Sequence, residues 1–528
     1  MIQIGPFESV DVQNATARQM PPRWHLWVVA LLSLSCFWLG ARGLNWDALW
    51  SDEILSIYDA AAWVYGPGSP AEIIERISEQ NPWHAPGFFI GLNLWTRIAG
   101  SSIIALRGFA LLGGVLAVPL LYRVGARYLS PNAGLYGALI LGTSPMFIYY
   151  LHEVRMYAPV MSLTVVFLGS YLSLTEHRRP FTNATFFLSG VALLYSHYMA
   201  GLVVVAFLIF HVFMARRGSR WQHILSLLLL ALLAFTPWLS VLASGLDRAQ
   251  TTEELHARAL SALPLIGLTG VIFAYGSWPL LLTTLAGFAD SIKSVRKYPR
   301  FSTILIIAGV LFALIVAVNQ LVHVIHGGRL RYTLVLYPFF ALFVALAIEN
   351  LIKAVSPIRR IVGKLLLAAW LLIGLFGSYW PHTLVRAGWV MPESVVYPLH
   401  RVASVLRSQV EPADLIIYAV PEHYSPWMRH KNDTIAAFYF EGVQVDQFTL
   451  PYEENLDHLQ QSVDYVVNLA SIHQRIWLAY MPGYESSFLI RLEEQLTKHF
   501  GRCGAILDGD DIVVETFLLE GSPCPQST

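Results

Sequence analysis

Residues 25–53 read HLWVVALLSLSCFWLGARGLNWDALWSDE and place an apolar segment just before two adjacent carboxylates. The apolar part, His25 to Gly43, is long enough to cross a bilayer as a helix. Asp52 and Glu53 follow a few residues later, where hydrocarbon gives way to water. Carboxylates at that depth can act as a general base or bind a cation without the cost of burial in lipid.

The composition predicts a polytopic α-helical membrane protein. Of 528 residues, 55% are apolar and 13% are charged, and the mean hydropathy is +0.52. A soluble protein carries roughly 25% charged residues. The first apolar run is longer than that of a signal peptide, and no small-residue cleavage site follows it before Arg42, so we interpret it as an uncleaved span. About eleven spans are expected, at 25–43, 104–122, 131–151, 157–175, 182–199, 199–215, 222–243, 263–289, 301–322, 333–352 and 361–380.

Loop charges predict the orientation of these spans. With residues 1–24 as a cytoplasmic N-terminal segment, the inner loops hold 17 Lys and Arg and the outer loops hold 9. The positive-inside rule therefore places the N-terminus in the cytoplasm and the C-terminus outside, across a plasma (inner) membrane. Residues 25–380 then form the membrane domain.

One apolar segment is left out of the span count. Pro86–Ala99 is too short to cross a bilayer comfortably, and Trp95 and Arg97 suit an interfacial position. We expect a helix that lies on the outer surface, within a long first outer loop at 44–106. A helical pattern in the same loop covers Ala71–Gln80.

Residues 381–528 change in character and predict a small extracytoplasmic α/β domain. Strand-like runs begin at Asp414, Val463 and Asp511, and a helical pattern covers Leu489–Phe500. No Gly-rich phosphate loop occurs in the chain. Cys36 is expected to be a packed thiol in the first span. Cys503 and Cys524 are either a disulfide, in an oxidising compartment, or two unpaired thiols.

Polar clusters gather on one predicted side of the membrane. Each alone has an ordinary explanation, since interfacial arginines snorkel and a single histidine is usually structural. Five on one face, from distant parts of the sequence, favour a site. The clusters are Asp52-Glu53 with Asp47 nearby, His84 in NPWHAP, the stretch His152–Tyr157 with Glu153 and Arg155, Tyr195–Tyr198 with His197, and His326–Tyr332 with Arg329 and Arg331.

These residue types suit group transfer from a lipid-linked phosphate. A carboxylate takes the proton of the attacking acceptor, and Asp52 with Glu53 are the catalytic candidates. Arg155, Arg329 and Arg331 are candidates for holding the donor phosphate and offsetting the charge of the leaving group. His84, Glu153, Tyr157, His197 and Tyr198 are candidates for binding donor or acceptor.

The motifs resemble those of the GT-C superfamily of membrane glycosyltransferases. They are most similar to the family 39 group, which is related to protein O-mannosyltransferases and to the aminoarabinose transferase of lipid A. The resemblance covers about residues 25–355 and rests on LWSDEILS, HAPGFF, SPMFIYYLHEVRMYAP, YSHYMAGL and GGRLRYTLVLYP in that order. It implies an inverting transfer of a sugar from a polyprenyl phosphate on the outer face of the membrane, with Asp52 as the base.

The chain departs from its relatives at two points. Some relatives have an aspartate where this chain has Glu153, which leaves the role of that residue open. The tail lacks the Trp-Trp-Asp motif of oligosaccharyl transferases, so neither a required divalent metal nor a peptide acceptor is inferred. The expected partners are a polyprenyl-phosphate-linked sugar, membrane lipids and an acceptor of unknown class, with no nucleic acid.

Two rival interpretations stay open. A transporter or flippase of lipid-linked sugars would carry ionisable residues near the bilayer midplane, whereas these spans are nearly free of charge. A scaffold that binds glycolipids without catalysis would use the Asp-Glu pair only structurally. The sequence favours the enzyme.

Overall fold

The computed structural model describes residues 21–42, 44, 49–62, 66–251, 259–292, 299–379, 399–419, 439–440, 443–449, 456–480, 487–508, 512–519 and 524. The chain divides into two compact units, each considered by itself here. Unit 1 comprises Met1–Leu44, Pro70–Trp95 and Ile103–Glu393, and unit 2 comprises Asn45–Ser69, Thr96–Ser102 and Ser394–Thr528. Part of the first predicted outer loop therefore belongs with the C-terminal domain.

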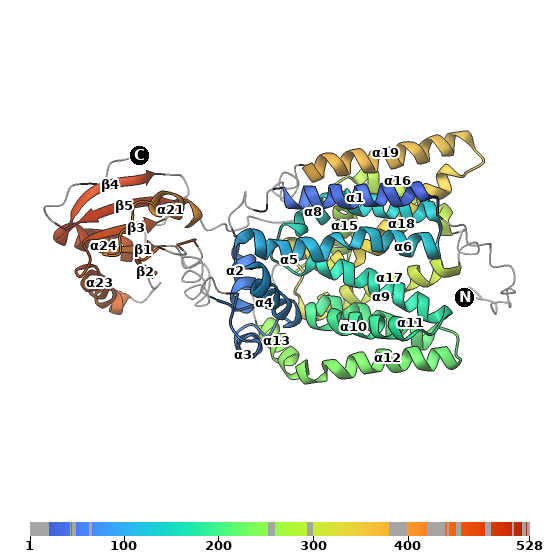
Figure 1. The fold of residues 1–528 in the computed structure, drawn as a ribbon, viewed down its shortest axis with the longest axis horizontal. Helices are drawn as coiled ribbons and strands as arrows, with labels where there is room; N and C mark the ends of the chain where they lie inside the picture. The colour runs from blue at the N-terminus through green and yellow to red at the C-terminus, as the bar shows by residue number, and fades with distance from the viewer. Residues whose placement is uncertain are drawn as a thin grey trace. The chain divides into compact units, whose positions relative to one another are not determined.

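Unit 1 is a bundle of apolar helices that run side by side (Figure 1). In chain order the helices are α1 (Arg23–Ala41), α3 (Pro70–Glu79), α4 (Gly87–Ala99, which ends in unit 2), α5 (Ile103–Val115), α6 (Ala117–Tyr128), α7 (Pro131–Gly142), α8 (Pro145–Leu151), α9 (Tyr157–Glu176), α10 (Pro180–Ser196), α11 (Tyr198–Phe213), α12 (Ser219–Phe235), η2 (Thr236–Trp238), α13 (Leu239–Thr251), α15 (Ala262–Phe273), α16 (Trp278–Ile292), α17 (Pro299–Val322), η4 (Gly327–Leu336), α18 (Tyr337–Ile352) and α19 (Pro357–Tyr379).

The membrane class predicted from composition is confirmed. Among the described residues, seven helices are long and apolar enough to cross a membrane, or nine if each of two bent helix pairs is one span. Helices α10 and α11, which the sequence predicts as two spans, have 17 and 16 residues. The count of eleven stays a prediction.

Two predicted spans are bent where the local sequence interrupts the helix. The span at 131–151 turns by 60° between α7 and α8, and Ser144 caps the new helix ahead of Pro145. The span at 263–289 turns by 94° between α15 and α16. Tyr275 and Gly276 lie at that bend with φ of 58° and 78°, a left-handed conformation that a continuous helix excludes.

The centre of the bundle is packed closely enough to fix the helix ends. Helix α9, with 67% of its apolar window buried, and the segment Arg329–Ile352 formed by η4 and α18, with 78%, are the most enclosed spans among the seven. Helices α6 and α7 approach so closely that a Cβ on Gly134 would lie 2.4 Å from the backbone nitrogen of Ala126. Rigid packing of this kind holds the turns between helices in one arrangement, and the polar clusters lie in those turns.

Both helices predicted in the first outer loop are present. Helix α3 buries Ile73 and Ile77 one turn apart and pairs Glu72 with Arg76 at 2.5 Å. In α4, the Trp95 Nε1–H donates to the backbone oxygen of Ala105 at 2.7 Å. The position of α4 on the outer surface is not tested by these contacts.

The C-terminal part of unit 2 is an α/β domain, as predicted. Its helices are α21 (Leu399–Leu406), α23 (Leu456–Ala470) and α24 (Ser487–His499). Its strands are β1 (Asp414–Ala419), β2 (Asp446–Thr449), β3 (Arg475–Tyr480), β4 (Gly501–Asp508) and β5 (Val513–Leu518), in the sheet order β2-β1-β3-β5-β4. Strand β1 pairs with β2 and β3 in parallel, and β5 pairs antiparallel with β3 and β4.

One predicted strand of this domain is wrong. The run that begins at Val463 lies in helix α23, where Val463, Val466 and Ala470 are buried at helical spacing in the core against the sheet. Asp464, Tyr465 and Asn468 between them are exposed, so the period of burial, rather than the β-branched composition, decides the structure. The predicted strands near 414 and 511 and the helix near 489–500 correspond to β1, β5 and α24.

The cysteines resolve the alternative that the sequence left open. Cys503 and Cys524 form a disulfide with their Cα atoms 5.5 Å apart, and the Cys36 thiol is buried in α1.

Candidate active site

A short turn between α8 and α9 carries Glu153 and Arg155, two of the predicted site residues, together with His152. His152 Nε2 lies 3.0 Å from the backbone oxygen of Leu39 and so ties the turn to α1. Arg155 and Glu153 are buried, with 2% and 4% of their surfaces exposed, and the Arg155 N–H donates to the Glu153 backbone oxygen at 2.7 Å. Charged side chains this deeply buried are held in fixed positions.

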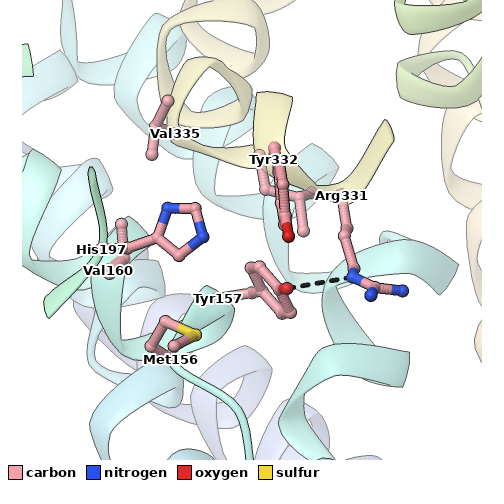
Figure 2. A pocket seen from close by; sticks show the side chains of 8 residues that line it. Met156, Tyr157, Val160, His197, Arg331, Tyr332 and Val335 are labelled. Atoms are coloured by element: carbon pink, nitrogen blue, oxygen red, sulfur yellow. Dashed lines mark hydrogen bonds between the residues drawn. The ribbon is translucent and has the colours of Figure 1, made fainter. Parts of the chain in front are cut away.

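Tyr157, the first residue of α9, is the centre of the cluster. Its hydroxyl oxygen accepts a hydrogen bond from Arg331 Nε at 2.9 Å and a long one from Arg155 Nη2 at 3.5 Å. The guanidinium carbons of both arginines lie 5.7 Å from the centre of its ring. Figure 2 shows the Arg331 side chain, from η4, meeting the phenol oxygen. Two positive charges therefore converge on one small acceptor.

Aromatic rings continue this cluster. The His197 ring lies 5.9 Å from Tyr157 and 4.9 Å from Tyr332, between centroids (Figure 2). A cavity of about 10 Å³, hardly larger than one water molecule, lies among these rings and the Arg331 side chain. Met156, Val160, Leu334 and Val335 complete its lining.

His197 lies in the turn between α10 and α11, and its environment keeps it neutral. Its Nδ1 accepts a hydrogen bond from the backbone N–H of Met199 at 3.1 Å, which caps α11 and leaves the proton of the neutral ring on Nε2. The nearby charges of Arg155 and Arg331 oppose a further positive charge on this ring.

Tyr198 holds the segment that carries His84. Its hydroxyl lies 2.8 Å from the backbone oxygens of both Pro82 and His84, and it accepts a hydrogen bond from Trp238 Nε1 at 3.0 Å. Tyr198 was predicted to bind donor or acceptor, and in this structure its hydroxyl contacts the protein backbone. His84 itself is buried, with its ring 5.2 Å from that of Phe89.

Helix α13 holds the same segment from another direction, which the sequence did not reveal. Arg248 donates from Nη2 to the Glu79 oxygen at 3.0 Å and from Nη1 to the Gln80 oxygen at 3.4 Å. A Cβ on Gly245 would lie 2.4 Å from the Pro82 oxygen. The only sequence signal was a glycine and an arginine one turn apart, a pattern too common to indicate a contact.

The structure distinguishes the two arginines of η4. Arg331 is 8% exposed and reaches Tyr157, as described above. Arg329 is partly exposed, and its side chain donates to the backbone oxygen of Val324 at 3.5 Å, within its own loop. Because η4 has three residues per turn, side chains two positions apart point in different directions, and these two contact different neighbours.

The predicted catalytic pair lies in unit 2, on helix α2 (Ser51–Asp59). Glu53 is fully buried, and its Oε2 accepts the backbone N–H of Trp50 at 3.3 Å, so it caps its own helix. Asp52 is partly exposed. The Leu49 N–H donates to the Tyr439 hydroxyl at 3.1 Å, which joins the start of this helix to the tail. Asp47 lies outside the described residues.

No group of three or more His, Cys, Asp and Glu side chains suited to a metal ion occurs within the described ranges.

Comparison with known proteins identifies the fold. Residues 83–241 match the family profile of dolichyl-phosphate-mannose-protein mannosyltransferase. The crystal structure of ArnT from Cupriavidus metallidurans bound to undecaprenyl phosphate superposes with a TM-score of 0.58 at 14% identity, over 95% of this chain and 99% of that one. The chain has the fold of the GT-C membrane glycosyltransferases.

Other solved structures match the chain at lower similarity. The apo state of the same ArnT has a TM-score of 0.54 at 12% identity and covers 93% of this chain and 97% of that one. The oligosaccharyltransferase of Archaeoglobus fulgidus, with Zn and sulfate, has a TM-score of 0.47 at 14% identity over 91% and 71%. Comparison with the sequences of curated proteins gave no match.

The matched mannosyltransferase profile covers only part of the candidate site. His84, Glu153, Arg155, Tyr157, His197 and Tyr198 fall within residues 83–241, whereas Asp52, Arg329 and Arg331 fall outside. The profile match therefore says nothing about Arg331, whose contact with Tyr157 is known from the structure.

Proposed function

We propose that this protein is an inverting glycosyltransferase that moves a sugar from a polyprenyl-phosphate donor to an acceptor at the outer face of the membrane. The observation that carries the proposal is the convergence of Arg155 and Arg331 on the Tyr157 hydroxyl. Two buried guanidinium groups aimed at one oxygen are suited to a phosphate, which offers several oxygens at once.

The donor phosphate would replace the phenol oxygen as the partner of these arginines. The cavity at the cluster is too small for a phosphate, so binding requires the Tyr157 and Arg331 side chains to separate. The neutral His197 would then donate its Nε2 proton to a sugar or phosphate oxygen. The undecaprenyl phosphate in the ArnT crystal structure supports this class of donor.

In the transfer itself, the acceptor oxygen or nitrogen attacks the anomeric carbon from the side opposite the phosphate. The bond between that carbon and the phosphate oxygen breaks, and the polyprenyl phosphate leaves with the electron pair. Asp52 takes the acceptor's proton, because it is the partly exposed member of the pair. Glu53, buried as a helix cap, would position Asp52. The arginines offset the charge that grows on the phosphate.

The sidedness of the reaction is also part of the proposal. The Cys503–Cys524 disulfide supports an oxidising, extracytoplasmic compartment for the C-terminal domain. A reporter enzyme fused after Trp380 should be active only outside, and one fused at Gly218 only in the cytoplasm. The reverse result would place the candidate base on the cytoplasmic side and contradict the proposal.

A deletion strain tests the function and supplies its assay. We expect one polyprenyl-phosphate sugar to accumulate and one surface glycan modification to disappear, which would identify both substrates.

Asp52→Asn preserves the shape of the side chain and removes the proton acceptor, so it should lower the rate of sugar transfer on the order of 10²–10⁴-fold. Asp464→Asn, an exposed carboxylate of α23 in the same unit, is the matched control.

Two outcomes would count against the proposal. Full turnover by Asp52→Asn in correctly folded protein would remove Asp52 as the base. A lipid-linked sugar trapped on the inner leaflet of the deletion strain would indicate a flippase instead of an enzyme.

A further inference from the structure

A groove between α10 and α12 shares no lining residue with the cavity at the candidate active site. It has a volume of about 500 Å³ and is lined by Ala184, Phe187, Leu227, Leu230, Leu233, Ala234 and the single polar residue Asn183. The helix faces beside it expose Phe181 by 83%, Leu188 by 61% and Leu233 by 62%. Apolar surface this exposed on membrane helices faces lipid chains.

Asn183 marks the polar end of the groove. Its Oδ1 lies 3.0 Å from His223 Nε2, which joins the first turns of α10 and α12. The Asn183 N–H donates to the Arg179 backbone oxygen at 3.0 Å, so Arg179 lies one turn away. The groove therefore starts at the end of the bundle where α10 and α12 begin.

Arginines gather around that end. Arg178 donates through Nη2 to the Ser219 backbone oxygen, and Arg220 Nη1 donates to the Thr175 oxygen at 2.9 Å. The Arg217 guanidinium lies 5.9 Å from the centre of the Trp221 ring. These side chains are exposed, and a guanidinium has five N–H groups, so each keeps donors for a further ligand.

The nearest acid of these turns is already engaged. Glu176, at the end of α9, accepts from Arg127 at 2.8 Å and lies 4.0 Å from Arg300. The arginine cluster, defined as Arg178, Arg179, Arg217 and Arg220, thus keeps its positive charge at the mouth of an apolar groove.

We propose that this groove, with its arginine cluster, is a binding site for an anionic diacyl phospholipid. The acyl chains lie along α10 and α12, and the phosphate contacts Arg178 and Arg220. This pairing of an apolar channel with a cationic end matches the two halves of such a lipid. Exposed arginines alone would attract any anionic surface, whereas the groove gives the bound lipid a defined place.

The test measures lipid retention by the full-length protein in detergent, by native mass spectrometry. Phosphatidylglycerol should be retained more than phosphatidylcholine of the same chain length. The double variant Arg178→Gln, Arg220→Gln should retain about 25-fold less, since each arginine near an anionic lipid contributes about fivefold. Ala184→Trp, which fills the groove and leaves the charges, should reduce retention as well.

The control is Arg359→Gln, Arg360→Gln, an exposed pair at the start of α19. It should retain phosphatidylglycerol normally, and all variants should show the thermal unfolding of the parent. An equal loss in the control, or no loss with Ala184→Trp, would overturn the proposal by showing only nonspecific attraction. Displacement of the phospholipid by undecaprenyl phosphate would also overturn it, because the groove would then belong to the donor lipid.

Discussion

Arginines of opposite character lie near the two ends of α9. At its start, Arg155 and Arg331 are 2% and 8% exposed and share the hydroxyl of Tyr157. Past its end, Arg178 and Arg220 are exposed and contact only backbone oxygens among their described partners. The helix between them has 20 residues, or roughly 30 Å at 1.5 Å per residue.

This difference separates two uses of the same side chain. A buried guanidinium has lost its hydration and must be met by fixed acceptors, so it suits a ligand bound in one geometry. An exposed one keeps its water and moves, so it suits a fluid surface of lipid headgroups. We therefore expect substitutions at the start of α9 to affect catalysis and those past its end to affect lipid retention.

Among the arginine substitutions, Arg155→Lys gives the largest expected effect. Lysine keeps the charge but loses the planar fork that can hold two phosphate oxygens. Transfer of the sugar that accumulates in the deletion strain should slow about 100-fold, by the loss of one charge-assisted contact in the transition state. Arg220→Lys, at the other end, should change the rate less than about twofold. Equal losses of rate in the two variants would contradict a catalytic role that is specific to the buried arginines.

Gly245→Ala tests how closely α13 packs against the segment that carries His84. The added Cβ meets the Pro82 backbone oxygen at 2.4 Å, and backbone cannot yield cheaply. We expect a loss of about 1–3 kcal/mol in the free energy of unfolding, seen as a lower thermal midpoint. Gly267→Ala is the matched control, because nothing lies within 4 Å of its new Cβ. A thermal midpoint that falls equally in both variants would contradict close packing between Gly245 and Pro82.

The fold was accessible from the sequence because it rests on long patterns. Apolar runs and loop charges predict a membrane bundle, and the alternation of strands and helices predicts the tail. The run at Val463 failed because β-branched composition is a weaker signal than the spacing of buried positions. The 94° bend after α15 was not predicted, because one glycine, Gly276, is also compatible with a continuous apolar span and Tyr275 carries no residue-type signal for a positive φ.

The residues of the candidate site could be predicted from the sequence, but their arrangement could not. The sequence marked Arg329 and Arg331 equally, and only the η4 turn shows that Arg331 meets Tyr157. It marked Asp52 and Glu53 together, whereas in the structure Glu53 is a buried helix cap and Asp52 is partly exposed. Roles of this kind depend on which way a side chain points, and sequence spacing does not fix that outside regular helices and strands.

Binding of undecaprenyl phosphate to Arg331→Gln and Arg329→Gln tests the central claim most directly. The two arginines are two positions apart on η4, and only Arg331 contacts Tyr157. Native mass spectrometry of the purified variants should show about tenfold or greater loss of this lipid for Arg331→Gln, by removal of a charge-assisted hydrogen bond. Arg329→Gln should bind it like the parent. Equal binding by both variants, or a larger loss at Arg329, would contradict a phosphate site at Arg155, Tyr157 and Arg331.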